Sequence, residues 1–508
     1  MSPIRPRQLA AAIALAAAAA APLAAAPLQV DPSGSGEVLL HPYYTVEGGL
    51  TTLLTLHNGD AAVKAVRLRV REGRNGRTAL SMNLYLRAYE QWTAAIVDTG
   101  EGAELYSNSD ACLLTPGPVE QGAYRFGNGD YTGGRRDHPL DADPALAGLG
   151  RTRSGLIEVI EMGTLVAGNG PAELADEVTG LRVNGSYQRN CAAVAAAWQG
   201  AWADDPAASI GLPRGGLRGS AQIVDVEGGA LFAVPATALV NVYRVESAPG
   251  HLHRPADHPF PDLTAADHGG FVDVRVAGVE EPVRVMRAGG PGSGERDLPD
   301  AISLALLTAG MENRVSTTPE LAGSANFVVS LPTKHYYTDS YDAPTGSALF
   351  VDPFADDGAS CTPVRPLLAD ANGYGYGLRR PDPNDFFCFS PPPPPVPLPR
   401  VCGSVGTFVA RNPIIGSNGP LADPAPVRIY LGSDDKTLGL DFDTARPSPC
   451  NSLIPVPAPY LEIDGVRWTG LPAIGFVAQG YLNDHAQPGR IATYDSSLPH
   501  RRLPPLER

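Results

Sequence analysis

The feature that most limits how this chain can fold is a series of short runs of alternating apolar and polar residues. Residues 37–46 (EVLLHPYYTV) and 50–57 (LTTLLTLH) flank Glu47-Gly48-Gly49, a pattern that predicts a β-hairpin. Residues 65–72 (AVRLRVRE) come next, then the turn sequence Gly73-Arg74-Asn75-Gly76 and the strand-like runs 80–86 and 89–97. Five strands at about ten-residue spacing are typical of antiparallel β-sandwiches.

Further strand-like runs occur at residues 156–162, 221–226, 327–331, 427–431 and 474–479. Helical patterns are few. Asn190 can cap a helix over Cys191–Trp198, and Asp300 can cap one over residues 301–313. The 56 glycines and 50 prolines favour turns over long helices. We therefore expect a mainly β fold of antiparallel β-sandwich-like domains with a few short helices.

The N-terminus predicts export. In residues 1–26, Arg5 and Arg7 precede an apolar, alanine-rich run with small residues near its end, which is the layout of a signal peptide. No second apolar run reaches the ~18–20 residues that span a bilayer, so we expect no transmembrane anchor. The formal charge of −15 argues against nucleic-acid partners. We expect the protein in the periplasm, at the cell surface or secreted.

Six cysteines lie after the predicted leader, and an even number in an exported chain predicts disulfides. The order of the cysteines along the chain favours Cys112–Cys191, Cys361–Cys388 and Cys402–Cys450. A bond between Cys388 and Cys402 is the alternative, and it would close the proline-rich segment between them. No CxxC motif occurs, so neither a redox dithiol nor a zinc ribbon is indicated.

The composition divides the chain into a leader (1–26), an N-terminal β-rich region (27–248), a loop or linker insertion (249–299) and a C-terminal β-rich region (300–508). Residues 391–399 (PPPPPVPLP) lie in the last region. Five successive prolines form a polyproline II rod of roughly 15 Å. We interpret residues 391–399 as a rigid strap across the C-terminal region. An interdomain spacer and a docking site are the alternatives.

The run AVRLRVRE suggests a possible partner surface. Val66, Leu68 and Val70 alternate with Arg67, Arg69 and Arg71, a pattern that predicts one apolar face in the core and one basic face in solvent. The basic face could bind an anionic surface glycan or another copy of the protein. The alternative is that the arginines pair with acidic side chains on a neighbouring strand.

The weak candidates for a divalent metal site are histidines in the insertion. His251, His253, His258 and His268 lie close together with several aspartates, and imidazole with carboxylate suits zinc, copper or nickel. The spacing matches no specific metal motif, and a solvated polar loop is the main interpretation. No cofactor is otherwise indicated. Motifs for a nucleophile elbow, a phosphate loop and a dinucleotide site are also missing from the sequence.

Several segments together resemble a known family. These include GEVLLHPYYTVEGGLTTLLTLHN, VRLRVREGRNGR, NLYLRAYEQWTAAI, GGLRGSAQIVDVEGG, VVSLPTKHYY and GLPAIGFVAQ. They are similar to a family of uncharacterised exported proteobacterial proteins, some of which are called cell-surface proteins. The resemblance implies export and a β-rich architecture, and it brings no catalytic or ligand-binding residues with it.

The sequence therefore predicts an exported, soluble, disulfide-bonded β-rich protein that acts as a binding or structural component of the periplasm or cell surface, without catalysis. The alternative is a secreted hydrolase whose carboxylate or metal site is assembled from residues far apart in the sequence.

Overall fold

The computed structural model describes residues 26–132, 147–166, 174–183, 186–243, 252–263, 271–286, 297–315, 323–338, 348–350, 352, 354, 360–370, 375–376, 400–410, 427–428, 436–442, 457–487 and 490–507. The fold is mainly β, as the sequence predicts, with several largely antiparallel sheets and a few short helices. Residues 1–25 of the predicted leader and the proline strap 391–399 lie outside these ranges. Within these ranges, no helix is long and apolar enough to cross a membrane.

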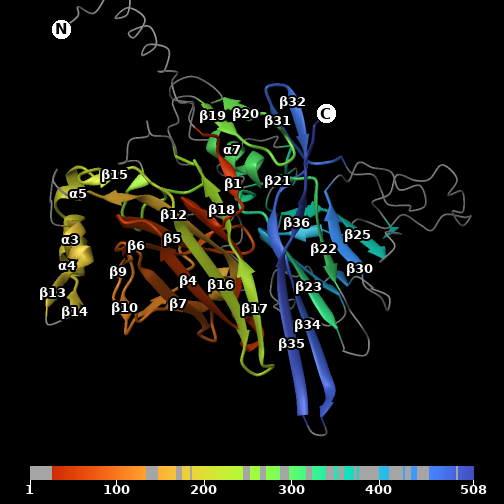
Figure 1. The fold of residues 1–508 in the computed structure, drawn as a ribbon, viewed down its shortest axis with the longest axis horizontal. Coiled ribbons are helices and arrows are strands. Elements are labelled where there is room, and N and C mark those ends of the chain that lie inside the picture. The colour runs from red at the N-terminus through yellow and green to blue at the C-terminus, as the bar shows by residue number, and fades with distance from the viewer. Residues whose placement is uncertain are drawn as a thin grey trace, which may run out of the picture.

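Two sheets form a sandwich in the N-terminal half (Figure 1). The inner sheet contains, in spatial order, β1 (Gln29–Asp31), β18 (Thr237–Val240), β3 (Val38–Thr45), β12 (Ser154–Leu165), β5 (Val63–Glu72), β6 (Thr78–Leu86) and β9 (Cys112–Leu114), with β15 (Ile210–Gly211) beside β12. The outer sheet contains β10 (Val119–Glu120), β11 (Ala123–Arg125), β8 (Ala103–Tyr106), β7 (Gln91–Asp98), β4 (Thr51–Asn58), β16 (Leu217–Asp225) and β17 (Ala230–Pro235), with β2 (Ser35–Gly36) beside β16.

The predicted hairpin between β3 and β4 is wrong, because these strands belong to different sheets. β3 pairs with β18 and β12, so neither of its edges is open to β4. The connection is the short 3₁₀ helix η1 (Glu47–Gly49), in which Gly48 and Gly49 have φ of 68° and 83°. Glycine adopts such positive φ values without steric cost, and the chain here turns from one sheet to the other.

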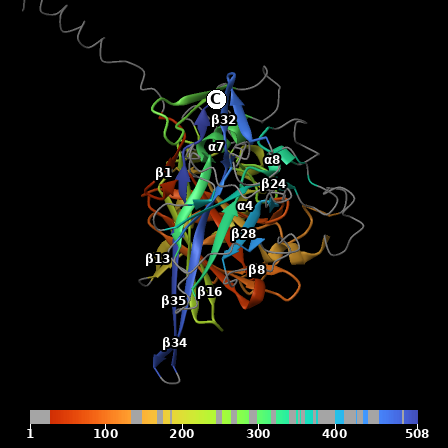
Figure 2. The same cartoon turned by 90° about the vertical axis from the view of Figure 1, so that its right-hand side faces the viewer.

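The C-terminal half contributes two further sheets. The third sheet contains β26 (Gly375–Tyr376), β25 (Arg365–Asp370), β30 (Lys436–Asp441), β22 (Gly310–Val315) and β36 (Arg501–Leu503). The fourth sheet contains β29 (Val427–Arg428), β28 (Val405–Ala410), β23 (Ser324–Ser330), β34 (Ile474–Gln487) and β35 (Arg490–Pro499). The long β34–β35 hairpin extends beyond the rest of the molecule in both views (Figures 1 and 2).

Shorter strands connect these layers. They are the pairs β13 (Leu181–Val183) with β14 (Ser186–Gln188), β19 (Phe271–Val274) with β20 (Val283–Met286), β21 (Leu307–Thr308) with β33 (Leu471–Pro472), β24 (Cys361–Pro363) with β27 (Arg400–Cys402), and the sheet of β31 (Tyr460–Ile463), β32 (Val466–Thr469) and β37 (Leu506–Glu507). Residues 252–263 pack against the inner sheet, so the predicted solvated loop is wrong for this part of the insertion: Leu252, His253 and Leu263 are buried.

The helices are short: η3 (Leu149–Arg153), α3 (Leu174–Thr179), α4 (Cys191–Ala197), α5 (Ala201–Asp204), α7 (Asp297–Leu306) and α8 (His335–Thr338). The predicted cap of α4 is confirmed, since the Asn190 side chain accepts a hydrogen bond from the backbone N–H of Ala193 at 3.2 Å. The helix predicted over 301–313 is wrong at both ends: α7 begins at Asp297, so Asp300 lies inside it and is not its cap. It ends at Leu306, because Gly310–Val315 pairs with β30 and β36.

Both faces of the inner sheet are covered. Leu39 and Leu68 face a core shared with the outer sheet, whereas Leu40 and Ile160 face a second core shared with α7 and the C-terminal sheets. Every residue of β5 and β12 is buried as a result. Among the residues that the structure describes, the outer sheet is covered on one face, and β4 and β7 alternate between buried and more accessible residues.

Candidate functional site

Arg67, Arg69 and Arg71, here called the arginine layer, lie on the face of β5 opposite Leu68. Their exposed fractions are 0%, 3% and 6%. The prediction that these arginines form a solvent-exposed basic face is therefore wrong. Residues 252–263, nearly 190 positions away in the sequence, cover this part of the inner sheet, and the local alternation of β5 carries no sign of them.

Arg67 and Arg69 bind the main chain of the covering segment, whereas Arg71 donates to the Gly76 carbonyl oxygen at 2.8 Å. Arg69 Nη2 donates to the carbonyl oxygen of Pro259 at 2.7 Å, and Arg67 Nε donates to Asn83 Oδ1 at 2.8 Å. The two Nη atoms of Arg67 donate at 2.7–3.0 Å to the carbonyl oxygens of Arg254, Pro255 and His258. Buried main-chain acceptors need such partners, and a planar guanidinium supplies several donors at once.

Glu158 on β12 provides the negative charge next to two of the arginines. Its Oε1 atom accepts from Arg71 Nε at 2.6 Å, and its Oε2 atom lies 3.8 Å from Arg69 Nη1. The predicted alternative, pairing with an acidic side chain on a neighbouring strand, is thus confirmed for these two residues. Burial opposes the charge on Arg71, but Glu158 outweighs it and raises the pKa. Arg67 binds neutral oxygens, and burial lowers its pKa to about 9.

The histidine candidates do not converge on one point. His253 is buried between Trp198 and Trp202, with ring centroids 4.7 and 4.6 Å away. Its Nδ1 atom lies 2.7 Å from the Pro206 carbonyl oxygen and its Nε2 atom 3.1 Å from the Tyr85 hydroxyl, so both ring nitrogens are engaged. Burial lowers its pKa to about 3.

His258 instead accepts a hydrogen bond from the backbone N–H of Phe260 at 3.0 Å. His251 and His268 lie outside the described residues. In the part of the chain that the structure describes, no group of three or more His, Cys, Asp or Glu side chains could hold a metal ion.

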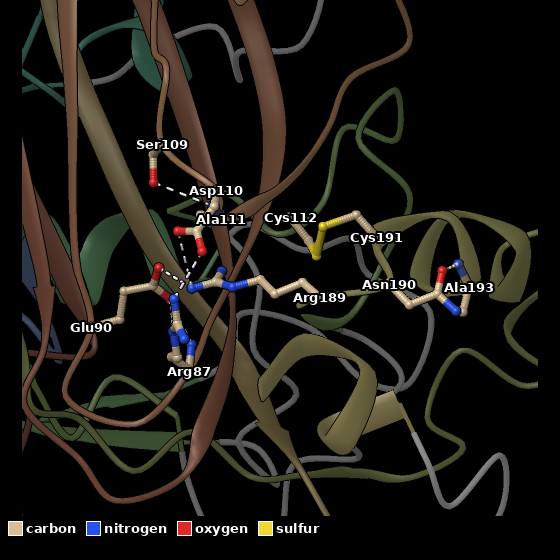
Figure 3. The surroundings of a disulfide bond; sticks show 10 residues. All are labelled: Arg87, Glu90, Ser109, Asp110, Ala111, Cys112, Arg189, Asn190, Cys191 and Ala193. Atoms are coloured by element: carbon tan, nitrogen blue, oxygen red, sulfur yellow. Dashed lines mark hydrogen bonds and ion pairs between the residues drawn. A yellow bond between two sulfur atoms is a disulfide. The ribbon is translucent and has the colours of Figure 1, made fainter. Parts of the chain in front are cut away.

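The predicted Cys112–Cys191 disulfide is present and joins β9 to the start of α4 (Figure 3). Charged side chains surround it: Arg189 pairs with Glu90, and Arg87 pairs with Asp110 at 3.0 Å. The bond and these ion pairs attach the α3–α5 region to the edge of the inner sheet.

The second disulfide corrects the predicted order. It joins Cys361 to Cys402, so Cys361–Cys388, Cys402–Cys450 and the alternative Cys388–Cys402 are all wrong. The reason is the strand register, since Cys361 and Cys402 are directly opposite each other in the β24–β27 pair. Cys388 and Cys450 lie outside the described residues.

Sequence reasoning missed a buried lysine beside this disulfide. Lys334 is fully buried, and its Nζ atom donates to the carbonyl oxygens of Ser360, Val401 (3.4 Å) and Gly403 (2.9 Å), each adjacent to a bonded cysteine. Burial lowers the pKa of Lys334 to about 7, although Asp352 opposes that shift. The only sequence signal is a lysine two residues after Pro332, which itself follows an apolar strand.

A second missed cluster lies at the other end of β5. Lys64 Nζ is 2.6 Å from Glu161 Oε1, and both side chains are fully buried. Glu161 also accepts the backbone N–H groups of Arg214 and Gly215, each at 2.9 Å. Nearby, Glu37 accepts from the N–H groups of Val242 and Tyr243, and burial, together with Glu161, raises the pKa of Glu37 to about 7. Glu161 and Glu37 therefore fix the main chain at residues 214–215 and 242–243, respectively.

Four of these buried charged groups, Arg67, Arg69, Glu161 and Lys334, bind main-chain carbonyl or N–H groups of segments that are distant in sequence. This arrangement can fix those segments against the sheets. Glu158 is paired with Arg69 and Arg71, and its Oε2 atom has no hydrogen-bond partner in the part of the chain that the structure describes. No protein-family model, no curated protein and no solved structure matches the chain.

Proposed function

We propose that the protein is exported and acts as a binding or structural component of the periplasm or cell surface, without catalysis. The pair of disulfides supports the first half of this proposal, because such bonds persist in oxidising compartments and are rare in the cytosol. The leader pattern of residues 1–26 and the resemblance to exported proteins point the same way.

The use of the buried charges supports the second half. Catalytic sites generally hold titratable groups aimed at a space where substrate can lie. Here Glu158, Glu161 and Lys334 are instead engaged with protein atoms. Such contacts stabilise a fixed architecture, which is what a structural or binding component requires.

Fractionation of the producing cell tests the location. The full chain with a C-terminal tag should be found in the periplasm or at the surface, with a mass showing that the leader has been removed. A variant that begins after residue 26 is the control and should stay in the cytosol. A cytosolic full-length chain with reduced cysteines overturns the proposal. Turnover of glycoside or peptide substrates by the purified protein would overturn its non-catalytic part.

A further inference from the structure

A lysine and two carboxyl groups meet inside the N-terminal sandwich at the start of β5. Lys64 Nζ lies 2.6 Å from Glu161 Oε1 and 3.5 Å from Asp60 Oδ2. The side chains of Lys64 and Glu161 are fully buried, whereas that of Asp60 is 20% exposed. Another buried ion pair, Arg151 with Glu72, uses a guanidinium that stays protonated. A lysine amine can instead lose its proton and act as a nucleophile.

A β-bulge turns Glu161 toward Lys64. In the pairing of β12 with β5, Thr164 lies opposite Lys64. Glu161 lies opposite Val66, because β12 holds one extra residue between these two pairs. In a regular ladder that kept Thr164 in place, Glu161 would lie opposite Arg67 and point to the other face of the sheet. Bulges re-aim side chains in this way and are common next to reactive sites.

The Glu161 carboxyl group is held in a geometry that suits attack on its carbon. The backbone N–H of Arg214 donates to Oε1 and that of Gly215 donates to Oε2, each at 2.9 Å. Donors on both oxygens stabilise the negative charge that develops when a nucleophile adds to the carbon. That carbon lies one C–O bond of about 1.2 Å beyond Oε1, so it is within about 4 Å of Lys64 Nζ, close to a near-attack arrangement.

The two carboxyl groups differ in the way that a condensation needs. Burial raises the pKa of Glu161 and so favours the protonated form, which can lose water. Burial opposes the charge on Asp60 as well, but Lys64, with other neighbours, outweighs it and holds the pKa of Asp60 below its ordinary value. Asp60 is therefore ionised and can accept a proton. Groups whose pKa values are displaced in opposite directions divide into an acid and a base.

We propose that Lys64 and Glu161 condense to an isopeptide bond that cross-links β5 to β12. The Lys64 ammonium passes one proton to the Glu161 carboxylate, and the neutral nitrogen attacks Cδ of Glu161. Asp60 takes a second proton from the nitrogen and delivers it to the leaving hydroxyl group. The Cδ–O bond then breaks and one water molecule leaves. An ammonium and a carboxylate are thus replaced by an amide and water, with no oxidant, reductant or other reactant.

The cross-link goes beyond the proposed function, and it turns over no external substrate. It removes a buried ion pair, whose desolvation is costly. It joins positions 97 residues apart on adjacent strands. Unlike the two disulfides, it resists reduction, so it holds the inner sheet together under reducing conditions as well.

Mass spectrometry of the full chain, purified from the producing cell and then reduced and denatured, tests the proposal. Proteolysis should yield a branched peptide that joins the segments around Lys64 and Glu161, with a mass about 18 Da, one water, below their sum. Lys64→Arg keeps the charge and should give the two segments separately. Asp60→Asn keeps both reacting groups and should lower the cross-linked fraction at least about tenfold, because it removes the proton acceptor.

The matched control is Asp110→Asn, which also removes an ion-pairing carboxylate, at a side chain that is 64% exposed. It should leave the cross-linked fraction unchanged. A wild-type chain that gives the two segments only as separate peptides overturns the proposal, as does a cross-link that Asp60→Asn or Lys64→Arg leaves undiminished. A control that lowers the fraction as much as Asp60→Asn also overturns it. None of these outcomes depends on where the protein is found, so this proposal and the proposed function fail separately.

Discussion

Acid should destabilise this protein well above the pH at which most carboxylates are protonated, because of three buried histidines. His41 and His253 are fully buried, and His500 is almost so. His500 lies with Nε2 2.7 Å from the Val328 carbonyl oxygen, and His253 Nδ1 lies 2.7 Å from that of Pro206. Burial lowers the pKa of His41 to about 4 and those of His253 and His500 to about 3.

The sign follows from where the protons bind. Since the folded pKa values lie below the ordinary 6.5, protons bind the unfolded chain first as the pH falls through 6.5, and stability is lost down to the folded values. Between pH 7 and 5 each histidine costs about 2 kcal/mol, so the three together cost roughly 6 kcal/mol.

Glu37 acts in the opposite direction over the same range. Its folded pKa of about 7 lies above its ordinary 4.5, so its protonation favours the folded state as the pH falls. This offsets about 2 kcal/mol between pH 7 and 5. Glu72, whose pKa is held down mainly by Arg151 against the effect of burial, loses its contribution only at lower pH. The three histidines and Glu37 together leave a net loss of roughly 4 kcal/mol, a large fraction of the ~5–15 kcal/mol that stabilises a typical domain. Lys334 adds less than about 1 kcal/mol to that loss, because its folded pKa of about 7 lies below the ordinary 10.5 and the unfolded chain stays protonated at this position throughout the range. His335, whose pKa burial lowers well below 6.5, adds to the loss as well.

Urea denaturation at pH 7, 6 and 5 measures this loss. His253→Gln and His500→Gln should each be less stable at pH 7 and should each remove about a third of the histidine contribution to the pH slope. His57→Gln, at a partly accessible position on β4, is the matched control and should keep the slope. Stability that is equal or greater at pH 5, or a slope that both buried-site variants retain, would refute the reasoning.

Three further predictions concern stability and are measured in the same denaturation assay. Leu68→Ala should lower the free energy of unfolding by ~2–5 kcal/mol because Leu68 is fully buried. Leu498→Ala, at a leucine that is 49% exposed, should change it by less than about 0.5 kcal/mol. Equal effects of the two changes would contradict the placement of β5. Glu158→Gln should cost ~3–5 kcal/mol because it leaves buried arginines without their carboxylate, and Glu120→Gln in an exposed ion pair at most about 1 kcal/mol. Replacing both cysteines of the 79-residue Cys112–Cys191 loop by serine should cost roughly 4–5 kcal/mol, and thiol labelling of the unreduced wild type at these two positions would rule that bond out.

The sequence predicts the strands well because the signal for a strand is local. The alternation of β4 and the turn after β5 each depend on neighbouring residues, and the structure confirms them both. The predicted hairpin across η1 is wrong because a glycine-rich turn has the same local pattern whether it joins two strands of one sheet or connects two sheets. Its outcome depends on β12 and β18, which are distant in sequence and occupy both edges of β3.

The prediction of a solvent-exposed arginine face is wrong for a similar reason. Alternating arginines predict a solvent-exposed face only where nothing covers the strand, and the residues that cover it, such as Arg254, lie nearly 190 positions further along the chain. The Cys361–Cys402 bond likewise depends on the register of two short strands that enclose a 41-residue separation. Long-range packing decides both features, and no local pattern contains it.

The distribution of charge in the sandwich is the reverse of what strand patterns usually imply. β5 carries three arginines and is buried throughout, whereas the more accessible positions 51, 53 and 55 of β4 hold threonine and leucine. A buried arginine is costly unless it binds other groups, so each is matched to carbonyl oxygens or to Glu158. The arginines of β5 therefore stabilise the interior contacts between segments that are distant in sequence, a role that their local alternation does not reveal.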